Sequence, residues 1–222
     1  MVVMSCLLVT GVFLLATPPV LSATPPARPT WPATFMVNFE EFWPDGGGDS
    51  KEAAYALDMT YVDPATGIVG AQAVLRGETE DFSCSAVNPG NKCVTLAVGG
   101  QRYLLFDDGP TTCCRCCSWE DGCGPLAPQW TENATYIGTK TVRGEACYSY
   151  NIAGNENNSY SVRASDGLPC DLNNAGFDFY EFIPSTYKAN VPGAADLFKV
   201  PGGCDTWCGA HGACKFGNAS SH

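Results

Sequence analysis

Histidine is scarce in this 222-residue chain, and the familiar catalytic motifs are missing. Its two histidines are His211, which lies among glycines, and His222, the last residue. A cysteine–histidine nucleophile also needs a free thiolate, and the 12 cysteines after residue 23 make an even number. No Gly-x-Ser-x-Gly elbow, phosphate-binding loop or dinucleotide fingerprint occurs. These absences argue against an enzyme.

Carboxylates are the remaining source of acid–base chemistry. Glu40 and Glu41 are neighbours, as are Asp107 and Asp108. Adjacent residues of a strand point to opposite faces, so Glu40 and Glu41 are not expected to act together. Two carboxylates that meet elsewhere in the fold would still permit a glycosidase, and this remains the third hypothesis.

Basic residues are also few. Lys and Arg number 12 against 23 Asp and Glu, which gives a formal net charge of -11. Nucleic acids and anionic membranes bind basic patches, so neither is expected as a partner. The acidic balance favours solubility and is compatible with loose divalent-cation binding.

Sustained helical periodicity is nearly absent, and 24 Gly with 16 Pro are too many for a helical bundle. Short helices are expected only within residues 110–129, within 194–198 and after Cys204. Strand-like stretches separated by turn signals instead recur about every ten residues, at 35–39, 54–62, 68–75, 93–98, 102–106, 136–142, 146–152, 160–164 and 177–182. This pattern predicts an all-β fold, arranged as an antiparallel sandwich or half-barrel.

Residues 1–22 are typical of a cleaved signal peptide. The apolar run at 6–16 is shorter than the roughly 20 residues that span a membrane, and Pro18 and Pro19 end it. We therefore expect a secreted or lumenal protein without a transmembrane segment. Three glycosylation sequons, at Asn133, Asn157 and Asn218, are consistent with a secreted or lumenal location.

Three regions are expected after the signal peptide: a Pro-rich arm at 23–30, a β domain at 31–204 and a Cys/Gly-rich tail at 205–222. Four cysteines form the run Cys-Cys-Arg-Cys-Cys at 113–117, which a thiolate metal site would also explain. An oxidising compartment favours disulfides instead, without fixing their connectivity. The cysteines expected in disulfides are Cys84, Cys93, Cys113, Cys114, Cys116, Cys117, Cys123, Cys147, Cys170, Cys204, Cys208 and Cys214.

Large apolar side chains, most of them aromatic, alternate along the expected strands. Such residues line ligand cavities, but they also fill ordinary cores between sheets. The cavity candidates are Phe35, Phe39, Tyr55, Leu57, Tyr61, Tyr103, Tyr148, Tyr150, Phe177 and Phe179.

The order of several short motifs resembles the ependymin-related proteins, a secreted glycoprotein family. The motifs lie at 103–106, 128–130, 136–138, 144–150, 160–163, 167–169, 177–179 and 194–204, within a similar layout from Trp31 to Cys204. The resemblance implies two stacked, curved antiparallel sheets of the bacterial lipoprotein-carrier type, which enclose an apolar cavity for a lipid-like ligand. It implies weak association with calcium, the one cofactor expectation. It also implies that Cys204 ties the closing segment to one cysteine of the 113–117 run, with the two Cα atoms roughly 4.4–6.8 Å apart. The other cysteines of the run are likewise expected to bridge to distant partners.

Three functions follow from these observations. The leading hypothesis is a secreted glycoprotein that binds a hydrophobic, lipid-like molecule in a cavity. The rival is a structural or adhesive module of an extracellular matrix or cell wall, whose partners are matrix components or a second copy of the chain. The third is a pro-domain-like module or an enzyme.

Overall fold

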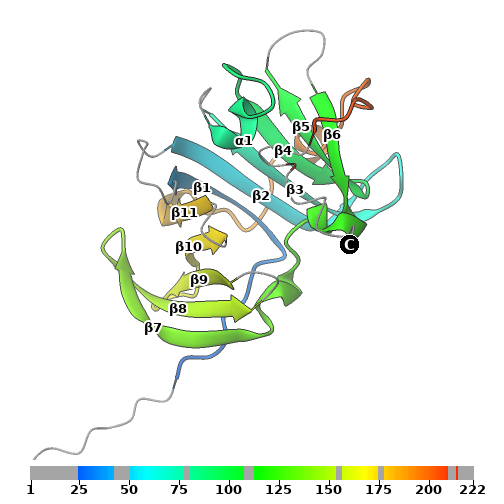
Figure 1. The fold of residues 1–222 in the computed structure, drawn as a ribbon. Coiled ribbons are helices and arrows are strands. Elements are labelled where there is room, and N and C mark those ends of the chain that lie inside the picture. Colours follow the sequence, from blue (N-terminus) through cyan, green and yellow to red (C-terminus); the bar gives the residue numbers. More distant parts are fainter. Residues whose placement is uncertain are drawn as a thin grey trace, which may run out of the picture.

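The computed structural model describes residues 25–42, 51–77, 81–107, 113–153, 157–174, 178–209 and 214. Its strands form one antiparallel sheet of 11 strands, in the order β6-β5-β4-β3-β2-β1-β11-β10-β9-β8-β7 (Figure 1). The predicted all-β, disulfide-bonded fold with few short helices is confirmed. None of the described helices is long and apolar enough to cross a membrane.

The strands are β1 (Thr34–Phe42), β2 (Lys51–Val62), β3 (Val69–Arg76), β4 (Cys93–Val98), β5 (Gln101–Phe106), β6 (Cys113–Ser118), β7 (Ala134–Val142), β8 (Glu145–Ala153), β9 (Asn157–Arg163), β10 (Pro169–Asn174) and β11 (Asp178–Phe182). The short helical elements are α1 (Phe82–Ser85), η1 (Trp119–Cys123), η2 (Pro128–Thr131), η3 (Pro184–Thr186) and α2 (Ala194–Leu197).

The first and last strands pair with each other, and this pairing makes the sheet continuous. Strands β1 to β6 form one part of the sheet and β7 to β11 form the other. Within each part, every strand pairs with the strand that follows it in the sequence. Phe39 of β1 then lies opposite Phe182 of β11, so the two parts meet along one ladder and do not stack as two separate sheets. The consecutive strands β6 and β7 therefore lie at opposite edges of the sheet.

The sheet is strongly curved. The Trp31 ring lies 5.6 Å from the Tyr55 ring of β2 and 5.2 Å from the Tyr160 ring of β9. Those strands are four inter-strand steps apart, which would be about 19 Å in a flat sheet. The face that carries both tyrosines is therefore concave. Register shifts in the β2–β3, β9–β10 and β7–β8 pairs are of the kind that bend strands. Figure 1 shows the result, with β7–β9 turned away from the direction of β2–β5.

The chain after β11 covers the convex face of the first five strands. Met36 of β1 exchanges backbone hydrogen bonds with Lys188, and both are 2.8–2.9 Å long. Phe198 is fully buried in a cluster with Ala56, Ala73 and Leu96 from three strands. This segment was expected to return to the sheet, and the structure confirms it.

All 12 expected cysteines are disulfide-bonded. Cys113 pairs with Cys204 with Cα atoms 5.1 Å apart, as the family resemblance implied. The remaining pairs are Cys84–Cys93, Cys114–Cys208, Cys116–Cys214, Cys117–Cys123 and Cys147–Cys170.

One expectation about the cysteine run is wrong. Cys117 was expected to bridge to a distant cysteine, but its partner Cys123 is only six residues away. A tight turn brings the two together. The Ser118 side chain caps the backbone N–H of Asp121, and Gly122 adopts a φ of +87°, which favours glycine.

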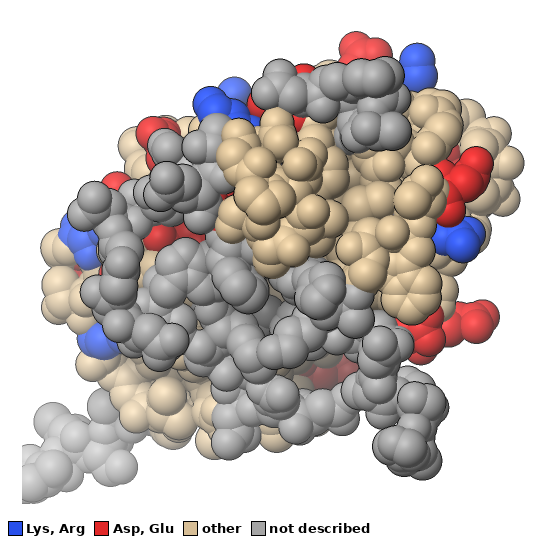
Figure 2. Space-filling view, turned by 45° about the horizontal axis from the view of Figure 1, so that its top comes forward, with Lys and Arg blue, Asp and Glu red and all other residues tan. Residues whose placement is uncertain are grey.

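Charged side chains are sparse on the described part of one face of the molecule. In the view of Figure 2, acidic and basic residues lie mainly around the margins, and uncharged residues cover most of the remaining described area. Asn133 is exposed in the turn before β7, and its glycosylation stays a prediction. Residues 1–22, Asn218 and the side chain of Asn157 lie outside the described part, so the signal peptide and those two sequons stay predictions.

Candidate binding site

The concave face carries a large aromatic cluster. Strand alternation places Phe35 and Phe39 of β1 beside Tyr55 and Leu57 of β2, and Tyr150 of β8 joins them from the other half of the sheet. All five are almost fully buried, and Tyr148 packs against them. The structure therefore brings together six of the ten residues that the sequence suggested for a cavity.

The other four candidates do not join this cluster. Tyr61 and Tyr103 pack on the convex side, in the cluster around Phe198. For Tyr61 the reason is the register shift between Asp58 and Val62, which reverses the alternation set by Tyr55 and Leu57. Tyr103 pairs with Leu96, which belongs to the convex cluster, while the next residue Leu104 faces inward.

Phe179 stands apart from both clusters. On the same strand, β11, the side chains of Tyr180 and Phe182 point to the concave face. The Phe179 ring instead meets Phe42 at 6.1 Å and the Lys140 ammonium at 5.8 Å. Phe177 lies outside the described residues.

Two tryptophans from outside the strands occupy the centre of the concave face. Trp31, which follows the Pro-rich arm, is fully buried and meets the rings of Phe35, Tyr55 and Tyr160 edge-on. Trp130 of η2 lies 5.6 Å from both Trp31 and Tyr160. Sequence reasoning missed all three central residues: Trp31 and Trp130 belong to no strand, and Tyr160 was overlooked. For Trp31, the available signal in the sequence was a large aromatic residue directly after a Pro-rich segment.

The cluster contains three hydrogen-bond donors without an acceptor. Within the described chain, the indole Nε1 atoms of Trp31 and Trp130 and the hydroxyl of Tyr160 are buried and have no hydrogen-bond partner. Burial raises the pKa of Tyr160 well above its ordinary value of 10.0, so this hydroxyl keeps its proton at neutral pH. Tyr55, also fully buried, differs because its hydroxyl donates to Oε1 of Gln72 at 2.7 Å.

A groove of about 330 Å³ opens beside this cluster. Tyr148, Tyr150 and Val162 line one side, and arm residues 26–30 line the other. The Tyr150 hydroxyl donates to the Ala27 carbonyl at 2.7 Å, and Arg28 donates to the Glu132 carbonyl at 2.7 Å. These two bonds hold the arm as a wall of the groove.

The turn between β9 and β10 places two charged side chains, Arg163 and Asp166, at the edge of the groove. Arg163 pairs with Asp166, and the Leu168 N–H donates to the same carboxylate at 3.1 Å. Burial acts to raise the pKa of Asp166, but the hydrogen bonds from Arg163 and Leu168 outweigh it, and the pKa lies below its ordinary value. The edge therefore carries one cation and one anion that neutralise each other.

A buried ion-pair network lies at another part of the sheet. Arg76 contacts the carboxylates of Glu41 at 3.3 Å and Asp81 at 3.1 Å, and it donates to the Thr95 hydroxyl at 2.8 Å. Glu40 takes the opposite face and pairs with Arg143 at 2.7 Å, so the two neighbouring glutamates are separated as expected. Because one arginine binds both carboxylates, the network has the character of a structural anchor for β1, β3 and α1.

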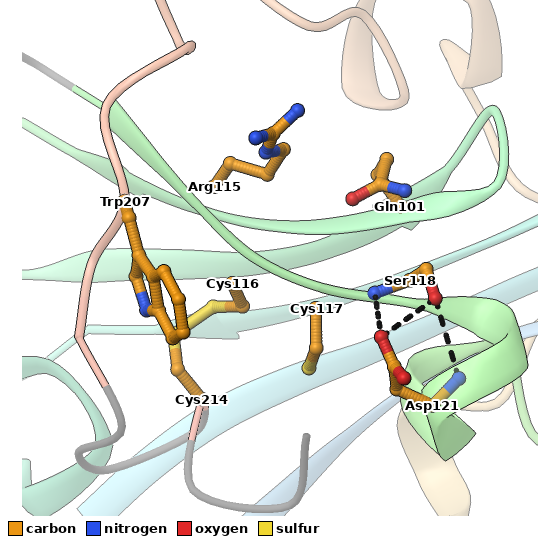
Figure 3. Close-up of a pocket in the computed structure, with 8 residues that line it drawn as sticks. All are labelled: Gln101, Arg115, Cys116, Cys117, Ser118, Asp121, Trp207 and Cys214. Atoms are coloured by element: carbon orange, nitrogen blue, oxygen red, sulfur yellow. Dashed lines mark hydrogen bonds between the residues drawn. A yellow bond between two sulfur atoms is a disulfide. The ribbon is translucent and has the colours of Figure 1, made fainter. Parts of the chain in front are cut away.

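A second pocket, of about 420 Å³, lies over the cysteine-rich strand β6 (Figure 3). Arg115, Trp207, Gln101 and Asp121 line it, and the Cys116–Cys214 disulfide forms part of its wall. Three sulfur atoms, those of Cys116, Cys208 and Cys214, lie within 4.8 Å of one another. They are the one group of ligand atoms in the described chain that is close enough for a metal, but each is in a disulfide, whereas metals bind thiolates. Calcium binding stays an expectation.

Comparisons with known proteins reach only distant structures. No protein-family model and no curated protein matches the chain. Similar solved structures include MucB (12% identity, TM-score 0.39, 79% of this chain and 60% of that one) and an uncharacterized conserved protein from Thermus thermophilus (9%, 0.45, 78% and 90%). A third is the LolA superfamily protein NE2245 from Nitrosomonas europaea (11%, 0.34, 76% and 92%). The chain thus spans about 60% of the length of MucB. The ependymin resemblance remains an expectation.

Proposed function

We propose that the protein is a secreted, non-enzymatic binding module that holds an apolar molecule with a polar acceptor group on the concave face of its sheet. The observation that carries this proposal is the set of three buried donors, Trp31 Nε1, Trp130 Nε1 and the Tyr160 hydroxyl, in one aromatic cluster. Buried donors in native proteins nearly always have acceptors, and leaving one without costs about 1–3 kcal/mol. A bound carboxylate or ester carbonyl would supply the missing acceptor.

The surroundings of the donors suit the rest of such a ligand. Aromatic side chains from β1, β2, β8, β9 and β11 form an apolar wall, and the adjoining groove of about 330 Å³ has the size of a small-molecule site. Fatty acids combine an apolar chain with a carboxylate. We therefore propose a fatty acid or a similar lipid as the ligand, with the arm and the adjacent Trp31 shifting to admit it.

The test compares two tyrosine variants in binding a fluorescent fatty acid. Tyr160→Phe removes a donor that has no partner in the structure, so the free protein should keep its stability while affinity falls about 5–30-fold, the equivalent of about 1–2 kcal/mol. Tyr136→Phe is the matched control, because the Tyr136 hydroxyl is exposed and lies 2.9 Å from the Thr139 hydroxyl. Equal affinity of Tyr160→Phe and the parent protein, together with no lipid in organic extracts of the secreted protein, would count against the proposal.

A structural or adhesive module is the second candidate. Exposed Trp207, Val62, Val69 and Ile137 favour it, because large apolar side chains on a surface are available for protein contacts. In this case the aromatic rings of the concave face would form only the hydrophobic core and would bind no ligand. Binding of matrix components or self-association without any extractable lipid would support this candidate over the first.

A further inference from the structure

Independently of the concave face, we propose that Cys114, Cys116, Cys208 and Cys214 form a thiol–disulfide exchange centre that a small anionic thiol reaches through the pocket of Figure 3. The Cys114–Cys208 and Cys116–Cys214 bonds lie side by side. The sulfur of Cys116 is 3.8 Å from the sulfur of Cys208, to which it is not bonded.

The backbone explains why the two disulfides are adjacent. Cys114 and Cys116 are two residues apart on β6, so their side chains project to the same face, with Arg115 pointing away between them. The tail runs alongside in a parallel bridge. The Arg115 N–H donates to the Thr206 carbonyl at 2.7 Å, and the Cys208 N–H donates to the Arg115 carbonyl at 3.0 Å. These bonds fix Cys208 between the two β6 cysteines.

The pocket provides access and a suitable charge. Arg115 is exposed at its margin, and an exposed guanidinium attracts an anionic thiol toward the pocket. The Asp121 carboxylate, which also lines the pocket, is directed toward Ser118, since it accepts from the Ser118 hydroxyl at 2.7 Å and from the Ser118 N–H at 3.2 Å. A tripeptide thiol such as glutathione has the required chemistry.

Each step of the exchange breaks one sulfur–sulfur bond and forms another, so no net oxidation occurs. The incoming thiolate attacks Cys214, forms a mixed disulfide there and releases the Cys116 thiolate. This thiolate attacks Cys208, forms the Cys116–Cys208 bond and releases the Cys114 thiolate. Attack of Cys114 on the mixed disulfide forms Cys114–Cys214 and returns the small thiol. The net result is an isomerisation of two disulfides.

The experiment uses the full-length secreted chain with Cys214→Ser, which leaves one thiol in the cluster. The protein is alkylated, digested with trypsin without reduction and mapped by mass spectrometry. Trypsin cleaves after Arg115 and so separates Cys114 from Cys116. We expect about half of the label on Cys114, because Cys116 and Cys114 compete for Cys208 in pairings of similar energy.

The matched control is Cys123→Ser, which frees Cys117 on the same strand, and its label should stay on the peptide that begins at Cys116. The parent protein provides a test without mutation. Brief exposure to reduced glutathione followed by alkylation should place label on Cys114 and glutathione on Cys214. Label confined to Cys116 in the Cys214→Ser protein, or label on Cys116 but never on Cys114 in the parent protein, would overturn the proposal.

Discussion

At the scale of single residues, hydrogen-bond partners distinguish structural tyrosines from candidate ligand-binding ones. Tyr55 donates to Gln72, whose Oε1 atom also accepts from the Leu126 N–H at 2.7 Å, so this tyrosine helps to hold the η1–η2 connection against the sheet. Tyr160 is equally buried but has no such partner among the described residues. Two chemically identical side chains on one face thus have different roles, one in architecture and one available to a ligand.

Burial of these two tyrosines predicts how stability depends on alkaline pH. Burial raises the pKa of Tyr55 and of Tyr160 above 10.0, whereas in the unfolded chain both ionise near pH 10. Their contribution to stability is therefore complete below pH 10 and declines above it, by about 1.4 kcal/mol per pH unit for each tyrosine. The free energies of unfolding in urea at about pH 10 and pH 11 should differ by about 2 kcal/mol for the pair, because the full slope is reached only when the unfolded tyrosines are completely ionised, and Tyr160→Phe should halve that difference. A slope that Tyr160→Phe leaves unchanged would show that Tyr160 already ionises in the folded protein.

At the scale of elements, the segments between strands complete the concave face. Trp31 follows the arm directly, and the connection from β6 to β7 contributes Leu126 and Trp130. The strands could be predicted because alternation of side chains is a local pattern, and most expected strands lie within a few residues of the observed ones. Pairing of β1 with β11 could not be predicted, because it joins segments about 140 residues apart through a register that no local pattern encodes.

The docking of the arm on the sheet can be tested by comparing the stabilities of two tryptophan variants. Trp31→Ala should lower the free energy of unfolding by about 3–5 kcal/mol, because it removes a fully buried ring from the centre of the cluster. Trp207→Ala is the control and should stay within about 0.5 kcal/mol, since the Trp207 side chain is 59% exposed. Urea denaturation measures both. A small loss for Trp31→Ala would mean that the arm is only loosely docked on the sheet.

At the scale of the whole molecule, three disulfides join one edge strand to the C-terminal segment. Cys113–Cys204, Cys114–Cys208 and Cys116–Cys214 span 91, 94 and 98 residues, so they close nearly the same loop. In the chain-entropy model a single bridge across such a loop contributes about 4.6 kcal/mol. Once one bridge is present, each of the others closes only a few additional residues, and their contributions therefore overlap.

This overlap predicts an order-dependent cost of removal. The Cys113→Ala/Cys204→Ala pair alone should cost about 2 kcal/mol, because Cys114–Cys208 still closes the long loop. The last of the three bridges to be removed should cost about 4.6 kcal/mol, whichever one it is. Urea denaturation of the stepwise series measures each loss. Equal losses at every step would show that the bridges act through local strain relief or packing and not through the shared loop.

The same three bridges determine how the molecule would carry a mechanical load. A force applied between residue 25 and residue 214 would travel along the first half of the chain to Cys116 and cross directly to its partner Cys214. Strands β7 to β11 lie between these two cysteines in the sequence, so they would bear no tension and could stay folded within a covalently closed ring. The Cys84–Cys93 bond also takes residues 85–92 out of the loaded path, so the chain could extend by about 290 Å along residues 25–116, rather than the roughly 660 Å of the full segment. Under shear, therefore, the half of the sheet that carries Tyr148, Tyr150 and Tyr160 would be the shielded half.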